Sequence, residues 1–159
     1  MISATLYNLL WYPALPFVLL AANGADAQGS RERLGIAAPR LDSSGFRIWA
    51  HASSVGEIEA VQSVLARLLR ETPGARAVIT SMTPAGRDVA RRRIAKAAAC
   101  LLAPLDCPST VHAFLARVRP NLVLIAETEL WPNYFFQAKH AGARVAIING
   151  RISERSLAR

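Results

Sequence analysis

Residues 122–133 read LVLIAETELWPN, in which an apolar run ends in two glutamates that are followed by an aromatic residue and a proline. Such a run is typical of a buried strand, and a charged side chain is costly to bury unless it is paired or has a function. Glu127 and Glu129 would therefore lie at the carboxyl end of a strand, where α/β proteins bind their ligands. This stretch predicts an α/β fold with a polar crevice at one edge of the sheet.

On both sides of this stretch, strand-like and helix-like segments alternate. The predicted strands are residues 47–52, 75–81, 100–105, 122–126 and 143–148. The predicted helices between them are residues 57–71, 84–98, 108–118 and 130–140. Strands that alternate with helices of about 10–15 residues imply right-handed crossovers and a parallel sheet. We therefore expect a Rossmann-like α/β domain over residues 45–159, in which helices flank a parallel sheet.

The composition fits one globular domain with a short appendage. The chain has 159 residues, of which 52% are hydrophobic, so it can form a substantial core. The formal net charge of +8 suggests an anionic partner such as phosphate, nucleic acid or an acidic membrane, although an arginine-rich composition explains the charge equally well. The spacing of Cys100 and Cys107 fits no metal or redox motif. We expect no metal, no cofactor and a reducing compartment.

The N-terminal segment is uncharged up to residue 25, and residues 1–22 are mostly apolar. As a helix it would be roughly 31 Å long, enough to cross a bilayer core, although Pro13 and Pro16 would kink it or let it lie in one leaflet. A cleaved signal peptide is the alternative, but no basic residue precedes the apolar region. We predict an uncleaved membrane anchor over residues 1–22 and a linker over residues 23–44. Arginines follow the anchor, which places the domain in the cytoplasm.

A second polar cluster follows the first predicted strand, where residues 53–57 read SSVGE. Gly56 permits a tight turn and the close approach of a ligand to the backbone, and Ser54 adds a hydroxyl. Glu57 would lie in the first turn of a helix, whose dipole favours a carboxylate that can accept a proton from a hydroxyl nucleophile. Simple placement of negative charge at a helix start would also explain Glu57. Ser54 and Gly56 are candidate substrate-binding residues.

A third cluster, rich in hydroxyl groups, follows the second predicted strand, where residues 80–86 read TSMTPAG. Pro84 is favoured in the first turn of a helix, and the free N–H groups of that turn can bind an anion. Thr80, Thr83 and Gly86 are therefore candidate substrate-binding residues. The alternative for Thr83 is an ordinary helix N-cap, and this is the stronger interpretation of that residue.

Other polar residues give less specific signals. Arg151 follows the fifth predicted strand and is able to hold a phosphate or carboxylate through two hydrogen bonds. Asp106 is expected to be the N-cap of the helix after it, and His51 is interpreted as a packed residue of its strand. The sequence has no Walker loop, no Gly-x-Gly-x-x-Gly and no Gly-x-Ser-x-Gly. No basic patch is interleaved with aromatic residues, so we expect no nucleic-acid partner.

Several of these segments resemble the bacterial 3-deoxy-D-manno-octulosonic acid (Kdo) transferases of lipopolysaccharide synthesis. The matching segments are the apolar N-terminus, SVGE at 54–57, TSMTPAG at 80–86, PLD at 104–106, ETELWPN at 127–133 and NGRIS at 149–153. Their order and spacing match as well, and Glu-x-Glu-Leu-Trp-Pro together with the other segments is highly specific. The chain is similar to the N-terminal part of such an enzyme, and the family is far longer.

The resemblance implies an inverting glycosyltransferase of the GT-B architecture, with two Rossmann-like domains, at the cytoplasmic face of the bacterial inner membrane. In that family the N-terminal domain receives the lipid A precursor (lipid IVA), and a C-terminal domain, missing here, binds CMP-Kdo. The resemblance assigns the role of general base to Glu57 and stabilisation of the transition state to Glu127. Glu129 then suits a structural or substrate-orienting role. The resemblance also implies that this chain alone lacks transferase activity.

Two other functions remain open on the sequence. A non-catalytic, membrane-tethered module that binds phosphorylated glycolipid would keep the anchor, the arginines and the strand-end hydroxyls. In that case Glu57 would be dispensable. A secreted α/β protein would result if the N-terminal segment were cleaved.

Overall fold

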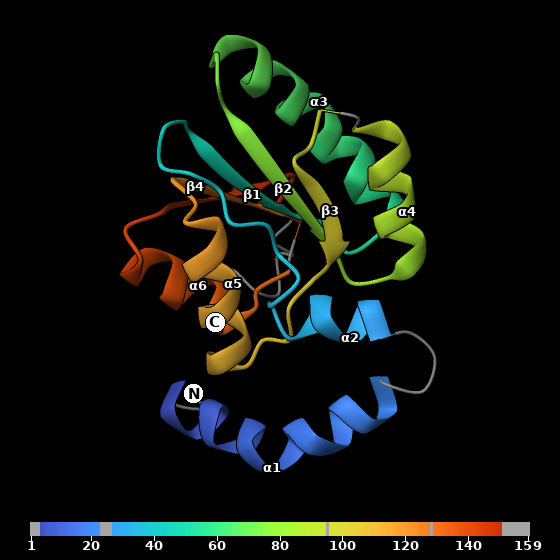
Figure 1. The fold of residues 1–159 in the computed structure, drawn as a ribbon, viewed down its shortest axis with the longest axis vertical. Helices are drawn as coiled ribbons and strands as arrows, with labels where there is room; N and C mark the ends of the chain where they lie inside the picture. Colours follow the sequence, from blue (N-terminus) through green and yellow to red (C-terminus); the bar gives the residue numbers. More distant parts are fainter. Residues whose placement is uncertain (1–3, 23–26, 95, 128, 151–159) are drawn as a thin grey trace, which may run out of the picture.

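The computed structural model describes residues 4–22, 27–94, 96–127 and 129–150. A central sheet lies between two layers of helices, and two N-terminal helices lie beyond one edge of it (Figure 1). The strands are β1 (Arg47–His51), β2 (Arg76–Ser81), β3 (Ala99–Leu102), β4 (Leu122–Ala126) and β5 (Arg144–Ile148). The helices are α1 (Ala4–Ala22), α2 (Ala27–Arg33), α3 (Val55–Glu71), α4 (Pro84–Arg93), α5 (Pro108–Val118) and α6 (Pro132–His140).

The five strands are parallel and lie in the order β3-β2-β1-β4-β5. Their register pairs His51 of β1 with Thr80 of β2 on one side and with Ile125 of β4 on the other. The chain builds outward from β1 to β3 and then returns to the other side of β1, so the direction of winding reverses between β1 and β4. In open parallel sheets a ligand binds at such a switch point, beyond the carboxyl ends of the strands.

Alternating side chains of the strands form two apolar cores, one on each face of the sheet. Trp49 of β1 points into the core under α5 and α6, where its ring centroid lies 4.7 Å from Phe114 and 4.9 Å from Tyr134. Ile48 points the other way and packs with Ile58 of α3. Because helices cover both faces, the strands are apolar throughout. The predicted α/β class, with a parallel sheet and flanking helices, is confirmed.

Two predicted elements are shorter than we expected, and each has a local reason. Helix α4 ends at Arg93 instead of residue 98, because Ile94 leaves helical geometry and its side chain is buried in the core. Strand β3 ends at Leu102 instead of residue 105, because Pro104 has no N–H group to continue the ladder. The other predicted strands and helices agree with the structure to within two residues at each end.

The N-terminal part of the chain differs more from the prediction. A helix does form over Ala4–Ala22, as expected for the predicted anchor. Among the described residues, however, no helix is both long enough and apolar enough to cross a membrane. Residues 27–33 were assigned to a linker but form helix α2, and the side chain of Glu32 in this helix is fully buried. This part of the predicted linker is therefore folded against the sheet.

Candidate functional site

Glu57 lies in the first turn of α3 and is only 8% exposed. Its Oε2 accepts the main-chain N–H of Ser53 at 2.8 Å, and its Oε1 accepts the hydroxyl of Ser54 at 2.9 Å. Ser54 is the N-cap of α3, and its Oγ accepts the N–H of Glu57 at 3.2 Å. The pair is thus a variant of the capping box. Each carboxylate oxygen keeps a further lone pair with which it can accept a proton.

Gly56 lies beside Glu57 in the first turn of α3 and is exposed. A Cβ atom added at Gly56 would meet no atom within 4 Å. Packing within the described part of the chain therefore does not require glycine at this position. The missing side chain leaves the N-terminal turn of α3 open, which suits the close approach of a ligand.

Thr80 is completely buried, and its hydroxyl lies in an internal hydrogen-bond network. The indole N–H of Trp49 donates to Thr80 Oγ1 at 2.8 Å, and Nδ1 of His51 lies 3.0 Å from the same oxygen. We predicted that Thr80 contacts substrate, but its side chain points into the core under α5 and α6 with its neighbour two residues back, Val78. Thr80 therefore positions the ring of His51 and does not itself face the crevice.

Thr83 and Gly86 form the tightly packed start of α4. Thr83 is the N-cap, and its Oγ1 accepts the N–H of Gly86 at 3.0 Å. A Cβ atom at Gly86 would lie 2.2 Å from Oγ of Ser81, so the helix can approach the end of β2 only with glycine at this position. The cap interpretation of Thr83 agrees with this geometry.

Glu127 directly follows β4 and has a left-handed backbone with φ of 54°. Such a conformation is unfavourable for a residue other than glycine, so surrounding contacts must hold it. The main-chain N–H of Glu127 donates to the carbonyl of Ile148 at 2.8 Å, and its Oε1 accepts Nδ2 of Asn149 at 3.3 Å. Arg151, the other predicted residue near this edge, lies outside the described residues.

Glu129 contacts its near neighbour Trp131. Its Oε2 accepts the indole N–H at 2.6 Å, and its carbonyl accepts the main-chain N–H of Trp131 at 3.0 Å. These contacts fix the aromatic ring at the start of α6. Glu129 therefore orients a neighbouring side chain, and its contact with substrate stays a prediction.

The structure places Glu57 and Glu127 at the same edge of the sheet. They follow β1 and β4, which are hydrogen-bonded neighbours on the two sides of the switch point. The predicted candidates Ser54 and Gly56 lie at this edge with Glu57, and Thr83 and Gly86 begin α4 after the next strand, β2. In the described part of the chain, no group of three or more His, Cys, Asp or Glu side chains is placed to hold a metal ion.

This arrangement can be compared with known proteins. A family model described as 3-deoxy-D-manno-octulosonic-acid transferase (kdotransferase) matches residues 28–159. The chain belongs to this family. The resemblance that the strand-end motifs suggested is thus confirmed.

Curated members of the family show the same similarity. The 3-deoxy-D-manno-octulosonic acid transferase of Chlamydia pneumoniae is 37% identical over 122 residues, which are 76% of this chain and 28% of that protein. The transferase of Haemophilus influenzae is 34% identical over 109 residues, which are 69% of this chain and 26% of that protein. The probable mitochondrial 3-deoxy-D-manno-octulosonic acid transferase of Arabidopsis thaliana is 30% identical over 115 residues, 72% of this chain and 26% of that protein. The matched region is less than a third of each relative.

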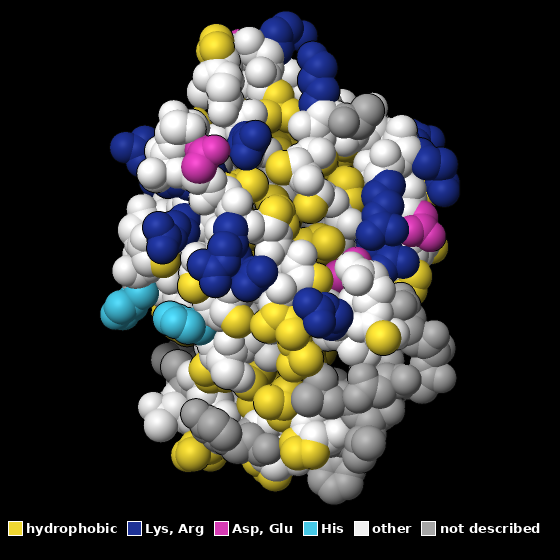
Figure 2. Space-filling model, in the orientation of Figure 1, with side chains coloured by type: hydrophobic (Ala, Val, Ile, Leu, Met, Phe, Trp, Pro, Cys, Tyr) yellow, Lys and Arg dark blue, Asp and Glu magenta, His cyan; other side chains and the backbone are white. Residues whose placement is uncertain are grey.

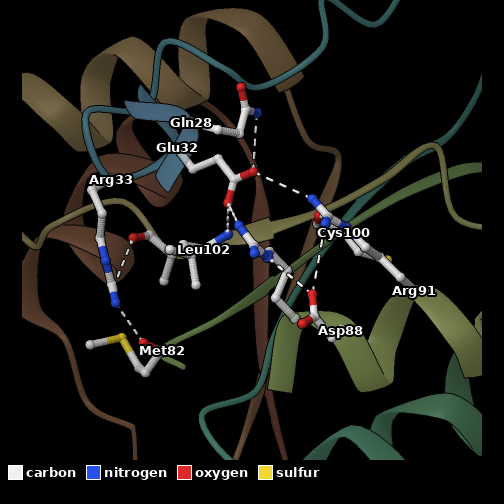
Figure 3. Close-up of polar contacts among 10 residues, drawn as sticks. Gln28, Glu32, Arg33, Met82, Asp88, Arg91, Cys100 and Leu102 are labelled. Carbon is white, nitrogen blue, oxygen red and sulfur yellow. Dashed lines mark hydrogen bonds and ion pairs between the residues drawn. The ribbon is translucent and has the colours of Figure 1, made fainter. Parts of the chain in front are cut away.

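Helix α2 adds residues to this edge of the Kdo transferase domain that the sequence motifs did not reveal. The carboxylate of Glu32 accepts the N–H of Leu102 at 2.7 Å and forms ion pairs with Arg87 at 3.0 Å and Arg91 at 3.5 Å (Figure 3). Arg33 points away from these residues and reaches the carbonyl of Met82, directly after β2. A seven-residue helix is too short to show a hydrophobic period, so the sequence pattern did not indicate this role.

Two other surfaces lie away from the candidate site. A cavity of about 600 Å³ lies at the opposite edge of the sheet, near Arg47 and Asn121, and none of the predicted site residues lines it. Basic side chains outnumber acidic ones on the face shown in Figure 2. At the end of the molecule that carries α1, hydrophobic side chains gather, and Leu6, Leu9 and Leu10 are more than half exposed.

Proposed function

We propose that this domain binds the acceptor in the transfer of Kdo from CMP-Kdo to a lipid A precursor, with Glu57 as the general base. One observation carries the proposal: Glu57 and Glu127 follow adjacent strands on the two sides of the switch point. Carboxylates in this place can act on a sugar hydroxyl that enters the crevice. Membership of the family supports the choice of substrates. We place the donor on the portion of the relatives that lies beyond the matched residues.

In the proposed step, the carboxylate of Glu57 takes the proton of the acceptor hydroxyl as its oxygen attacks the anomeric carbon of Kdo. The new C–O bond forms on the face opposite the leaving group, and the bond from that carbon to the phosphate oxygen of CMP breaks. The electron pair of the broken bond leaves with CMP. The bonds from Ser53 and Ser54 hold the carboxylate in one orientation, so that no rearrangement is needed at the moment of transfer.

Glu127 has the wrong charge to stabilise a departing phosphate. A carboxylate at that position favours the positive charge that develops at the anomeric carbon, or orients neighbouring donors. Its hydrogen bond from Asn149 ties the end of β4 to the end of β5. We propose that this tie keeps the Glu127 carboxylate in the crevice.

We also propose that α1 lies on the cytoplasmic face of the bacterial inner membrane. Its exposed Leu6, Leu9 and Leu10 supply apolar area for the lipid boundary, and the net charge of +8 favours anionic lipid. Co-sedimentation with vesicles that contain anionic lipid tests this. We expect Leu9→Glu together with Leu10→Glu to reduce the bound fraction, and unchanged binding would remove α1 from the contact.

The general base is tested by Glu57→Gln in a family-length enzyme that carries this sequence. Gln is the other residue that completes a capping box, so α3 should keep its start while the base is lost. We expect kcat to fall by about 10²–10⁴-fold, the usual contribution of a general base. Glu59→Gln is the matched control, because Glu59 lies on the same helix, is exposed and pairs with Arg93 at 2.8 Å.

The control should stay within about twofold of the parent enzyme. If Glu57→Gln also retains near-normal turnover with Kdo from CMP-Kdo, Glu57 is not the base. Binding of the glycolipid without any dependence of turnover on Glu57 would then favour the alternative, a non-catalytic glycolipid-binding module.

A further inference from the structure

Arg33 is a half-buried cation at the carboxyl edge of the sheet. Its Nη2 donates to the carbonyl of Met82 at 2.6 Å, and its Nη1 donates to the carbonyl of Ala103 at 3.4 Å (Figure 3). These carbonyls follow β2 and β3, so two strand ends fix the plane of the guanidinium. The Nε–H group of Arg33 has no acceptor among the described residues.

No carboxylate in the described part of the chain forms an ion pair with Arg33. The nearest in sequence, Glu32, is on the same helix, but its oxygens already pair with Arg87 and Arg91. Burial lowers the pKa of Arg33, as expected for a charge that is partly removed from water. The charge of Glu32 acts in the opposite direction, but its carboxylate makes no direct contact with Arg33, so the guanidinium can still take an anion as a direct partner.

His51 supplies a second donor without an acceptor. The indole of Trp49 is only a donor, so Thr80 Oγ1 accepts from it, and the hydroxyl hydrogen of Thr80 is free to donate to Nδ1 of His51. The ring is neutral, because burial lowers its pKa to about 4. This arrangement favours the tautomer with the hydrogen on Nε2, which is buried and has no hydrogen-bond partner among the described residues. The positive charge of Arg33 also lowers this pKa.

Ser53 supplies a third such group. Its Oγ is buried and has no hydrogen-bond partner in the described part of the chain. Ser53 lies two residues beyond the end of β1, and its carbonyl accepts the hydroxyl of Ser81, the last residue of β2, at 3.3 Å. Arg33, His51 and Ser53 thus place several donors and one positive charge at the carboxyl ends of β1 and β2, without an acceptor among the described residues.

We infer that Arg33, His51 and Ser53 form a binding site for a phosphate group of the substrate. A phosphate monoester carries nearly two negative charges and three acceptor oxygens, and a phosphodiester carries one negative charge and two such oxygens, so either can accept from one guanidinium and neutral donors. Ser53 and Arg33 are half-buried, and His51 is fully buried. This inference deepens the proposed function, because it names the anionic part of the acceptor or donor that meets this domain.

The test is an NMR titration of the 159-residue chain with inorganic phosphate. The ring-nitrogen signals of ¹⁵N-labelled protein first identify the tautomer of His51, and we expect its proton on Nε2. Phosphate should then shift the Nε2–H signal of His51 and the Nε–H signal of Arg33. Arg33→Gln should weaken phosphate binding by about tenfold or more, as expected for the loss of a charge-assisted hydrogen bond. Arg31→Gln is the matched control, because Arg31 is exposed on the same helix.

Two soluble probes identify the source of the phosphate. Tighter binding of a hexosamine phosphate assigns the site to the acceptor, and tighter binding of cytidine 5′-monophosphate assigns it to the donor. Unmoved His51 and Arg33 signals at saturating phosphate in the parent chain would overturn the inference, and this result does not depend on any variant folding. Because binding is measured without turnover, the inference can fail while Glu57 remains the base, and the reverse is also true.

Discussion

Asp106 caps a helix that begins 26 residues after it, not the helix beside it: its Oδ1 accepts the main-chain N–H of Tyr134 in α6 at 3.2 Å. Its Oδ2 accepts the main-chain N–H of the preceding residue, Asn133, at 3.3 Å and the hydroxyl of Tyr7 at 2.7 Å. The sequence predicted Asp106 as the N-cap of α5, but the N-cap of α5 is Cys107, whose side chain makes no capping hydrogen bond. One carboxylate thus joins α1 and α6 at the carboxyl edge of the sheet.

This arrangement predicts how stability depends on pH. Burial raises the pKa of Asp106 from its ordinary 3.8 to about 6, although its hydrogen bonds act in the opposite direction. Between these values the folded state binds more protons than the unfolded state, so the contribution of Asp106 to stability falls as pH rises from about 4 to about 6. Asp106→Asn removes this titration. The free energy of unfolding of the variant, relative to the parent, should therefore increase by roughly 2–3 kcal/mol over that interval.

Urea unfolding at several pH values between 4 and 7 measures this difference. Subtracting parent from variant cancels the titration of all other groups. A difference that stays constant with pH would show that the carboxyl of Asp106 does not titrate in this range.

His51 acts in the opposite direction over nearly the same range. Burial lowers its pKa from 6.5 to about 4, so the unfolded state binds more protons between these values. Stability from His51 is present above pH 6.5 and is lost as pH falls toward 4. His51→Asn keeps an acceptor near the position of Nδ1 and removes the titration. We expect the variant to lose less stability than the parent on acidification, by roughly 2–3 kcal/mol.

In the parent chain the effects of Asp106 and His51 partly cancel, so their joint contribution to the free energy of unfolding should change little between pH 4 and 6.5. The two difference curves, each variant minus the parent, should slope in opposite directions. If both slope in the same direction, one of the two assignments of burial is wrong.

Most of the fold follows from the period of the apolar residues. Strand β4 and helix α5 begin and end where the sequence predicts, because each has a complete pattern bounded by proline or charge. Helix α2 could not be predicted in this way. Its position depends on Glu32, whose partners Arg87 and Leu102 lie 55 and 70 residues away in the chain. Such long-range pairs leave no local pattern.

The candidate site was predictable in part. The sequence predicted parallel strands, and the carboxyl ends of parallel strands lie at one edge of the sheet. Glu57 and Glu127 were therefore expected at the same edge, and the pairing of β1 with β4 makes the two strands neighbours. The burial of Thr80 could have been predicted from the sequence. Side chains two residues apart in a strand point to the same face, so Thr80 points to the same face as the apolar Val78. Arg33 could not be placed, because its partners are main-chain carbonyls and any residue supplies those.

Two glycines at helix starts should respond differently to alanine. Gly86→Ala brings a Cβ atom to 2.2 Å from Oγ of Ser81, which is itself buried, so the start of α4 must move. We expect a loss of about 1–3 kcal/mol in the free energy of unfolding. Gly56→Ala is the matched control, since it meets no atom within 4 Å, and it should be neutral or stabilising by up to about 1 kcal/mol.

A second substitution, Ser81→Ala, added to Gly86→Ala tests whether the loss of stability comes from the contact with Oγ of Ser81 or from alanine itself. This removes the Oγ atom and leaves Oγ1 of Thr83, at 3.1 Å, and Cβ of residue 81, at 3.2 Å, as the nearest contacts. The double variant should recover part of the loss, so a double-mutant cycle should give a favourable coupling between the two substitutions. Strictly additive losses would contradict the proposed contact.

The last prediction concerns the ion pairs that hold α2. The side chain of Glu32 has no exposed surface, and its carboxylate pairs with Arg87 and Arg91 (Figure 3). Glu32→Gln keeps the shape but leaves these arginines without their counter-charge, so we expect a loss of about 3 kcal/mol. Glu71→Gln is the control, because Glu71 forms an exposed pair with Arg67 at 2.9 Å. The loss of this exposed pair should change stability by at most about 0.5 kcal/mol.

Salt gives a second readout of the same difference. An exposed pair is screened by ions, whereas a buried pair is screened much less. The effect of Glu32→Gln on the urea midpoint should therefore persist at 1 M NaCl, and any small effect of Glu71→Gln should disappear. If the two variants lose the same stability at low salt and both recover at high salt, Glu32 does not hold α2 through a buried ion pair.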